Sequence, residues 1–460
     1  MARTIAVFGG SFNPPGVHHR RVAEALRREF DGIVVVPCGP RPDKPSLDAV
    51  PPVFRAAMAD MAFRNCGAEI DLFDLEHAVF TPTHELQRRY ARRGEVWHVV
   101  RRDLVLGGGR GQSAIQRSWI NGPEVWESFN FVVVVPSGRE IEARDLPPRH
   151  RVVRLDIEGN DDVLRERVFR GESLDGLVAP EVSDFIRRRA LYQGRLPSRS
   201  SRWHTGDRRL LIVADEKNPK ARAWAERFRP LSCPHDPNCV LVLGGDGTML
   251  HAIQRHWRLR VPFFGINAGH LGFLLNDADR VLGDPFPPQG LVLRHLPLLY
   301  VEMQTPDGVW RGGLTFNDAW IERAGGQTAW VEVKIDNNVR LAKVVCDGVL
   351  LSTAAGSTAY ARAMGATPLL PDTPAWLIAG SNVLQPLNWK NALLSLDSEV
   401  EVGNLAPEKR PLNGYMYGVA LGEVLAMRAR VSRIAAVELA FHPEQDVTEK
   451  ITRIQFPKCE

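Results

Sequence analysis

The order of hydrophobic and polar residues divides the first half of the chain into short apolar runs and helical segments that alternate. Runs typical of β-strands fall at Thr4–Phe8, Gly32–Cys38, Glu95–Val100, Phe131–Pro136 and Val152–Ile157. Helical periodicity fits His19–Phe30, Val53–Phe63, Thr83–Arg93, Asp162–Arg170 and Pro180–Leu191. This β-α-β-α order predicts an α/β domain over residues 1–192, with a parallel sheet and right-handed crossovers.

A polar, Ser/Arg-rich stretch at residues 193–208 lacks hydrophobic periodicity and is typical of a linker. Beyond it, a strand-like run at Arg209–Ala214 precedes a helical segment at Pro219–Phe228 and a buried strand at Val240–Leu243. After residue 290, strand-like runs dominate. We therefore expect a second domain over residues 209–460, made of an α/β lobe (209–290), a β-rich lobe (291–440) and a C-terminal tail (441–460).

Composition narrows the class of protein. The 460 residues are 44% hydrophobic and 24% charged, which is ordinary for globular domains and excludes a disordered or collagen-like chain. The net charge of +4 is too small to indicate nucleic acid as the main partner. No apolar run approaches the roughly 18 residues needed to span a bilayer, so we expect no membrane partner.

The cysteines and the N-terminal residues indicate the compartment. Six cysteines at irregular spacings fit a reducing cytoplasm, and the N-terminal apolar run is typical of a strand and not of a signal peptide. Cys233, His235 and Cys239 lie close together in sequence, so a metal site there is possible. No second ligand pair follows at zinc-site spacing, and we expect free thiols and no protein-held metal.

A glycine-rich turn follows the first strand and leads into the first helix. It runs Gly-Gly-Ser-Phe-Asn-Pro-Pro-Gly-Val-His-His from Gly9 to His19. Glycines at such a turn let a triphosphate approach the backbone, and a helix N-terminus offers unpaired N–H groups and a positive dipole end. A histidine there can donate a hydrogen bond to a phosphate whose charge grows in the transition state. An ordinary Gly/Pro turn is the alternative.

This string resembles the signature GGSFxPxHxGH of the nicotinate/nicotinamide mononucleotide adenylyltransferases, and the resemblance covers most of residues 1–192. It implies a Rossmann-like nucleotidyltransferase domain. It also implies that His19 is catalytic and that nucleotides contact the residues matching the family's motifs: Gly9, Gly10, Ser11, Phe12, Lys44, Asp103 and Arg165.

The chain departs from that signature at two places. Gly16 falls where the family has its first histidine, and we expect the adjacent His18 to point elsewhere. Asn160, Asp161 and Asp162 replace hydroxyl residues that bind ATP phosphates in the family. Two carboxylates would repel a triphosphate unless Mg²⁺ intervenes; alternatively, the two acids simply cap the helix that follows.

A second glycine-rich turn, Gly244-Gly245-Asp246-Gly247-Thr248, joins a buried strand to a helical segment. Its glycines permit close approach of a phosphate, Thr248 can donate its hydroxyl, and Asp246 can take a proton from a hydroxyl nucleophile. The motif alone does not identify a substrate, because it occurs in lipid kinases and phosphofructokinases as well as in NAD kinases. An aspartate turn before a helix is the structural alternative.

Three later strings resemble NAD kinase segments in the family's order, over roughly residues 209–440. They are Phe264–Leu274, the pair Asn317-Asp318, and Asp347–Tyr360. The resemblance implies an NAD kinase fold with Asp246 as general base on the 2′-hydroxyl of the adenosine ribose of NAD, and Asn317 and Asp318 holding ribose hydroxyls. The other nucleotide-binding residues that it implies are Gly244, Gly245, Gly247, Thr248, Asn267, Asp347, Thr353, Ser357 and Tyr360.

The two resemblances together predict a bifunctional enzyme that makes NAD (or its deamido form) from a mononucleotide and phosphorylates NAD to NADP. ATP is the expected co-substrate and Mg²⁺ the expected cation, small nucleotides are the expected partners, and the kinase resemblance suggests a homo-oligomer. One alternative is a monofunctional NAD kinase whose first domain binds nucleotide as a regulator. Another is a non-catalytic NAD(P) sensor. The pyridine preference and the phosphoryl donor stay open.

Overall fold

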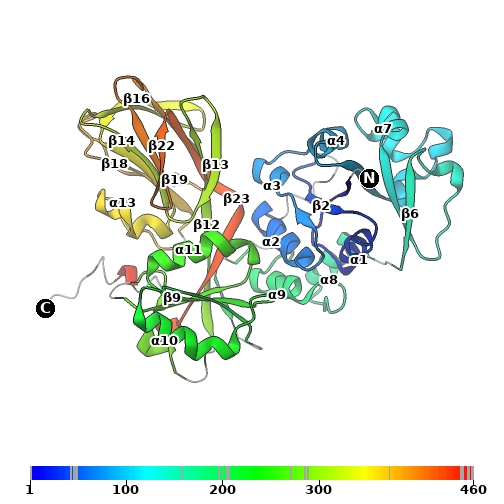
Figure 1. The fold of residues 1–460 in the computed structure, drawn as a ribbon, viewed down its shortest axis with the longest axis horizontal. Helices are drawn as coiled ribbons and strands as arrows, with labels where there is room; N and C mark the ends of the chain where they lie inside the picture. The colour runs from blue at the N-terminus through cyan, green and yellow to red at the C-terminus, as the bar shows by residue number, and fades with distance from the viewer. Residues whose placement is uncertain are drawn as a thin grey trace. The chain divides into compact units, whose positions relative to one another are not determined.

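The computed structural model of the chain describes residues 3–41, 44, 50–156, 159–194, 197–198, 200–203, 208–269, 272–283, 286, 288, 290–371, 373–445, 450–452 and 456. The chain divides into two units, Met1–Ser198 and Arg199–Glu460. Figure 1 shows the first unit in blue to teal and the second in green to red.

The first unit is built on one parallel sheet. Its order is β3 (Glu69–Ile70), β2 (Gly32–Pro37), β1 (Thr4–Gly10), β4 (Glu95–Arg101), β5 (Asn130–Pro136) and β6 (His150–Leu155). All neighbouring pairs are parallel, which confirms the predicted Rossmann-like α/β fold. The strand order changes direction between β1 and β4, so the carboxyl end of β1 lies where such sheets bind their ligands.

Helices cover both faces of this sheet because alternate strand residues point to opposite sides. Ala6 and Phe8 of β1 share a buried cluster with residues of α1 (Val17–Leu26), α2 (Pro52–Phe63), α8 (Asp161–Phe169) and α9 (Pro180–Arg189). Ile5 and Val7 pack with α4 (Thr83–Ala91) on the other face. The pattern did not predict α3 (Phe73–His77), α5 (Arg102–Val105), α6 (Ala114–Ser118) or α7 (Gly122–Ser128), because so few turns carry no readable period.

The second unit begins with another parallel arrangement. Strands β8 (Leu210–Ala214), β9 (Cys239–Gly244) and β10 (Phe263–Asn267) pair in that order, with α10 (Pro219–Phe228) and α11 (Asp246–His256) between them. Small elements follow at β11 (Asn276–Asp277) and α12 (Ala278–Val281). Part of the stretch expected to be a linker forms β7 (Ser200–Trp203), which pairs antiparallel with β12 (Leu291–Gln304).

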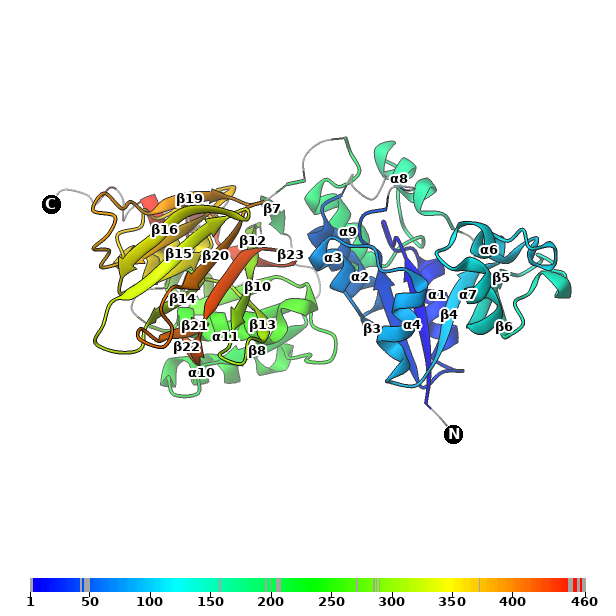
Figure 2. The ribbon, with the colours of Figure 1, turned by 90° about the horizontal axis from the view of Figure 1, so that it is seen from above.

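The rest of this unit is a sandwich of two antiparallel layers, drawn in yellow-green to red in Figure 2. One layer contains β16 (Asn338–Cys346), β15 (Ala329–Ile335), β20 (Glu399–Asn404), β23 (Ala426–Phe441), β12 and β13 (Trp310–Thr315). The other contains β19 (Ala392–Ser395), β18 (Ala375–Ser381), β17 (Gly348–Ser352), β14 (Asp318–Arg323), β21 (Leu412–Met416) and β22 (Val419–Val424). Val301, Ile321, Val331, Leu351 and Met427 belong to the apolar cluster between the layers.

One strand connects the two lobes of the second unit. Figure 1 shows β23 passing from the sandwich into the α/β lobe. Its first part pairs with β20, and its end runs parallel to β10. The last residues of the segment expected as β-rich therefore extend the α/β sheet, and the two lobes share a continuous backbone ladder.

None of the helices in the described part of the chain is both long and apolar enough to cross a membrane. Cys233 and Cys239 are free thiols, and neither joins His235 in a cluster at metal-ligand distance within the described part of the chain.

Candidate active sites

The turn after β1 brings the first group of predicted residues together. A Cβ on Gly10 would lie 2.8 Å from the ring of Phe12, so only glycine fits beside that ring. Phe12 itself is buried and packs edge-on against His19, with ring centroids 5.0 Å apart. Its side chain therefore belongs to the core, and only backbone groups of Gly9, Gly10 and Phe12 are left for a nucleotide.

His19 is fixed as a neutral hydrogen-bond donor. The backbone N–H of Gly16, which precedes α1, donates to His19 Nδ1 at 3.1 Å. Because Nδ1 accepts, the proton of the neutral ring resides on Nε2. Burial and the adjacent His18 lower the pKa of His19 from 6.5 to about 3, so the ring is uncharged at neutral pH.

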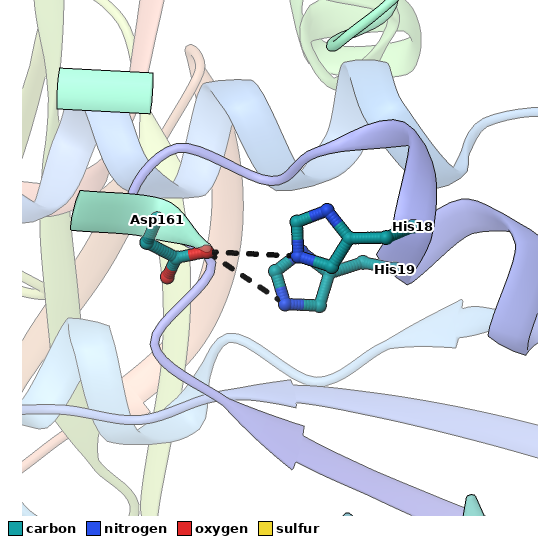
Figure 3. Close-up of side chains that lie close together, drawn as sticks. All are labelled: His18, His19 and Asp161. Carbon is teal, nitrogen blue, oxygen red and sulfur yellow. Dashed lines mark ion pairs between the residues drawn. The ribbon is translucent and has the colours of Figure 1, made fainter. Parts of the chain in front are cut away.

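The expectation that His18 points elsewhere is wrong. Figure 3 shows both imidazoles directed at Asp161, and His18 Nε2 and His19 Nε2 lie 3.9 Å and 3.8 Å from the same oxygen, Oδ1. Side chains at the start of a helix lean back toward its N-terminus, which brings both rings to the same end. Glycines at 16 and 159 leave the room, since a Cβ on either would lie 2.5 Å or 2.2 Å from the His18 ring.

Asp161 is held by donors. Its Oδ2 accepts hydrogen bonds from Ser11 Oγ (2.9 Å) and the backbone N–H of Asn13 (3.3 Å), and Lys44 Nζ donates to Ser11 Oγ (2.8 Å). Burial alone would raise the pKa of Asp161, but His19 and these two hydrogen bonds hold it below its ordinary value. The carboxyl group is therefore ionised at neutral pH.

The alternative that both acids cap the following helix is also wrong. The N-cap of α8 is Asn160, whose side chain accepts from the N–H of Asp162 at 3.0 Å. Asp162 pairs with Arg165, and Asp161 faces the histidines. The structure thus separates two adjacent carboxylates into different roles.

The remaining predicted residues of the first unit differ in position. Arg165 donates to the carbonyl of Asn13 and so lies beside the turn. Asp103 is mostly exposed, and its carboxylate accepts hydrogen bonds from Nε and Nη2 of Arg101 at 3.0 Å and 2.8 Å. Sequence reasoning gave no role to Arg55, whose buried guanidinium donates to the carbonyls of Ser11 (2.7 Å) and Cys38 (2.8 Å) and fixes the turn.

A cavity of about 260 Å³ lies beside His18. Its lining combines apolar side chains with charged ones, as in many small-ligand sites. The lining residues are Val17, His18, Arg21, Asp156, Gly159, Leu164, Gly176 and Leu177.

In the second unit, the turn after β9 presents Asp246 as the first residue of α11. A Cβ on Gly244 would lie 2.4 Å from Thr248 Oγ1, which makes this close strand–helix turn specific for glycine. Asp246 accepts hydrogen bonds from the backbone N–H groups of Phe273 (3.0 Å) and Leu274 (2.9 Å). Burial raises the pKa of Asp246, although these two hydrogen bonds oppose the shift.

Lys450 is a residue that sequence reasoning missed. Its Nζ donates to the carbonyls of Gly272 (2.6 Å) and Leu275 (2.5 Å), which flank the two N–H donors to Asp246. The loop is therefore held by hydrogen bonds both to the Asp246 carboxylate and from the Lys450 ammonium group. No local pattern links position 450 to position 246.

Asn317 and Asp318 bring two acceptors to the start of β14. The Oδ1 atom of Asn317 is buried and has no hydrogen-bond partner within the described residues. Asp318 is 7% exposed, and burial raises its pKa from 3.8 to about 7. A buried acceptor without a partner, such as Asn317 Oδ1, calls for an explanation in a native fold, and a ligand's hydroxyl group provides one.

The hydroxyl groups of the next loop hold the loop itself. Thr353 Oγ1 donates to the carbonyl of Phe316 (2.8 Å), and Ser357 Oγ donates to that of Ala354 (2.6 Å) while accepting from the N–H of Leu369 (2.7 Å). Thr353 therefore docks the predicted loop beside Asn317, and Ser357 ties the loop to Leu369; both side chains are buried.

An aromatic group lies next to this loop. Tyr360 packs edge-on against Trp320, with ring centroids 5.2 Å apart, and Trp320 stacks on Tyr415 at 4.8 Å. The Nε1 atom of Trp320 is buried without a partner in the described structure. Trp320 lies two residues after Asp318 on β14, so both point to the same face; that alternation was the signal for a second site residue there.

The last two predicted residues lie at strand ends, and Asn267 pairs with Gly244 of the glycine-rich turn. Asn267 ends β10, and its Oδ1 accepts from the N–H of Gly269 at 2.9 Å. Asp347 precedes β17 and accepts from Arg323 Nε (2.6 Å) and Asn382 Nδ2 (2.7 Å). At roughly 3.3 Å of rise per residue, Asp347 lies about 20 Å from Thr353 at the other end of the strand.

The glycine-rich turn and the later loop meet within the second unit. Met249 of α11, Phe316 and Ala355 belong to one apolar cluster that joins the two lobes. A Cβ on Gly245 or Gly247 would meet nothing within 4 Å, so the outer side of the turn is open. An open glycine turn at a helix N-terminus can hold phosphate groups beside the Asp246 carboxylate.

Comparison with known proteins matches each unit to a different family model. The model described as "ATP-NAD kinase N-terminal domain" matches residues 190–277, and the model described as "Cytidylyltransferase-like" matches residues 7–142. The first unit is therefore cytidylyltransferase-like.

Similar curated proteins cover the second half. The chain is 34% identical over 262 residues to an NAD kinase of Xanthomonas campestris, covering 54% of this chain and 97% of that protein. It is 32% identical over 224 residues to an NAD kinase of Mesorhizobium japonicum, covering 47% of this chain and 84% of that protein. Among solved structures, yeast NADH kinase complexed with NADH has 14% identity and a TM-score of 0.42, with 79% of this chain and 88% of that one covered.

Proposed function

This chain belongs to the NAD kinase family, and from that premise we propose that it is a bifunctional enzyme of pyridine nucleotide synthesis. Its second unit transfers a phosphoryl group from ATP to the 2′-hydroxyl of the adenosine ribose of NAD. Its first unit transfers an adenylyl group from ATP to nicotinate or nicotinamide mononucleotide.

The buried acceptors Asn317 and Asp318 carry the kinase proposal. Their oxygens, close to a loop that Thr353 fixes, suit the hydroxyl groups of a ribose. Asp246 takes the proton of the attacking hydroxyl while its two backbone hydrogen bonds hold the carboxylate in place. The 2′-oxygen of the ribose attacks the γ-phosphorus of ATP, and ADP leaves.

The group of donors at the first turn supports adenylyl transfer. Ser11, Lys44 and Arg165 converge there with the Nε2–H of His19. The phosphate of the mononucleotide attacks the α-phosphorus of ATP, a new P–O bond forms, and the bond to the departing pyrophosphate breaks. Such a direct displacement needs no protein nucleophile, so positioning and neutralisation of charge supply the catalysis.

Mg²⁺ enters both proposed reactions with the phosphates of ATP, where it neutralises charge. In the first unit, hydrogen-bond donors and the positive charge of Lys44 surround Asp161. These surroundings do not suit a cation bound by the protein, because a cation needs acceptors around it. Accordingly, we assign no step of the first reaction to an ion bound by Asp161.

One observation favours a second candidate function. The carboxylate of Asp161 lies among the groups that would bind phosphate. A first unit blocked in this way would leave a monofunctional NAD kinase whose first unit serves as a nucleotide-binding regulator.

The two candidates are separated by assaying the purified chain for both reactions. One reaction contains NAD and ATP; others contain ATP with amidated or deamidated mononucleotide, and chromatography detects NADP and dinucleotide. We expect both products, with His19→Ala removing only dinucleotide synthesis and Asp246→Ala removing only NADP. NADP without any dinucleotide favours the regulator, and the absence of NADP rejects the kinase proposal.

A further inference from the structure

Asp161 lies in surroundings that suit an anion. Two hydrogen-bond donors reach its Oδ2, Ser11 Oγ and the N–H of Asn13, while the Nε2 atoms of His18 and His19 face its Oδ1 at 3.9 Å and 3.8 Å. The donors come from the turn and from the N-terminus of α1, 142 or more residues away in sequence. A carboxylate so enclosed, 8% exposed, has the partners that a phosphate oxygen would have.

The same three side chains could in principle hold a metal ion, because their ligand atoms lie within 4.8 Å of one another. The hydrogen bond from the N–H of Gly16 to His19 Nδ1 argues against this. A metal-bound Nε2 requires the proton to move to Nδ1, where it would oppose the N–H of Gly16. The geometry therefore favours a donor at His19 Nε2 and an anion opposite it.

We propose that His18 and His19 together form a clamp for a nucleotide phosphate, and that Asp161 occupies this clamp until the phosphate displaces it. The proposal rests on the nucleotide-handling role of the first unit and names a second binding residue and an internal competitor for it. The ligand class is a pyrophosphate or triphosphate group.

Gly16 and Gly159 leave the space in which the ring of His18, the second histidine of the clamp, lies. A side chain at 16 would enter the space that the His18 ring fills, and so would one at 159. The two imidazoles lie 3.9 Å apart between centroids and diverge by only 40°, so they can grip one group from the same side. His18 also lines the 260 Å³ cavity, which places the clamp next to space for the rest of a nucleotide.

Asp161 can leave the clamp without unfolding the unit. It is the first residue of α8, directly after the N-cap Asn160, and helix ends open more readily than helix interiors. The competitor reduces the fraction of chains that can bind phosphate, and the apparent affinity falls by that fraction.

The test measures binding of pyrophosphate to the full chain by isothermal titration calorimetry. Asp161→Asn and Asp161→Ser should each bind pyrophosphate on the order of tenfold more tightly than the unaltered chain, because the competing charge is gone. Asp184→Asn is the matched control: it removes an exposed carboxylate of α9, which pairs with Arg187, and should leave the affinity unchanged. Binding by the second unit is common to all variants and cancels in the comparison.

The second arm examines His18. In the Asp161→Asn chain, His18→Gln should weaken pyrophosphate binding by about fivefold or more, since the clamp loses one donor. A thermal melt of every variant shows whether the first unit is folded, and the two replacements at 161 guard against a defect caused by either one.

Three outcomes overturn the proposal. If both Asp161 variants bind pyrophosphate equally well or more weakly than the unaltered chain, Asp161 does not compete with phosphate. If His18→Gln leaves the binding unchanged, His18 does not contact the phosphate. If the chain binds Zn²⁺ at micromolar concentration and this binding depends on His19, the three side chains form a metal site. None of these measurements requires turnover. A first unit that makes no dinucleotide can therefore still pass them, and the failure of adenylyl transfer stays distinguishable from the failure of the clamp.

Discussion

At the scale of single residues, burial has opposite outcomes for two carboxylates. Asp161 accepts two hydrogen bonds and faces His19, so its pKa lies below the ordinary value although the side chain is buried. Asp318 is equally buried, but desolvation is the sole cause of its shift, and its pKa is about 7. The two pKa values differ because the two carboxylates have different hydrogen-bond and charge partners, and not because their burial differs. Each pKa suits a different proposed role.

The raised pKa of Asp318 gives a pH dependence. The deprotonated form is the stronger acceptor of hydrogen bonds from ribose hydroxyls, so kcat/KM for NAD should rise as pH increases through about 7 and fall below it. Asp318→Asn should lose this inflection, while Asp397→Asn, at an exposed position, should keep it. A flat profile for the unaltered chain between about pH 6 and about pH 8 would contradict the assignment.

The same shift affects stability with a defined sign. Because the pKa of Asp318 is higher in the folded chain than in the unfolded one, the folded state binds this proton more tightly. Its contribution to the free energy of unfolding is therefore greatest at low pH and is lost as pH rises through about 7.

Asp246 is expected to contribute to the chemical step rather than to NAD binding. Asp246→Asn keeps the shape but cannot take a proton, so kcat for NADP formation should fall by about 10²- to 10⁴-fold. The dissociation constant of NAD, measured by calorimetry, should change by less than about threefold. Asp279→Asn, on the exposed face of α12, serves as the control, and near-normal kcat in Asp246→Asn would sink the assignment.

At the scale of elements, both sites are built at the point where a parallel strand gives way to a helix. The carboxyl ends of β1 and β9 each lead through glycines into a helix N-terminus, α1 and α11. Backbone N–H groups and the helix dipole converge there, which suits phosphate groups in both units.

The short helical turn at residues 450–452 supports the second site from outside it. Lys450→Met should release the loop of Phe273 and Leu274 and lower kcat for NADP formation by about tenfold, with KM for NAD changed less. Lys409→Met, at an exposed lysine, is the matched control. Unchanged kcat in Lys450→Met would show that the loop is held without this ammonium.

At the scale of the whole molecule, two units with separate cores carry two proposed reactions in sequence. A product of the first would be the substrate of the second, and joining the two in one chain raises its local concentration only if it is captured before it diffuses away.

This arrangement predicts complementation between inactivated chains. An equimolar mixture of His19→Ala and Asp246→Ala chains should make NADP from nicotinamide mononucleotide and ATP, because the dinucleotide can pass through solution. Each variant alone should make none. Failure of the mixture, with each surviving activity intact, would mean that the dinucleotide does not pass between chains.

Much of the fold was predictable because it depends on local patterns. The alternation of strand-like runs and helices predicted the parallel order of the first sheet, and the two glycine turns marked both candidate sites. The hydrogen bond from Lys44 to Ser11 joins two residues that the first resemblance had implicated in nucleotide binding. Elements of four to seven residues, such as α5 and α7, were missed because too few residues repeat in them.

The sequence by itself determined the fold class, both family resemblances and most of the side chains proposed for each site. Only the tertiary structure decided that His18 faces Asp161, that Lys450 grips the loop beside Asp246, and that Asp347 lies at the far end of β17. Contacts of this kind join residues that are far apart in the chain, and their direction depends on how helices and strands pack. A local motif fixes which groups are present, but the packing of distant elements fixes where those groups point.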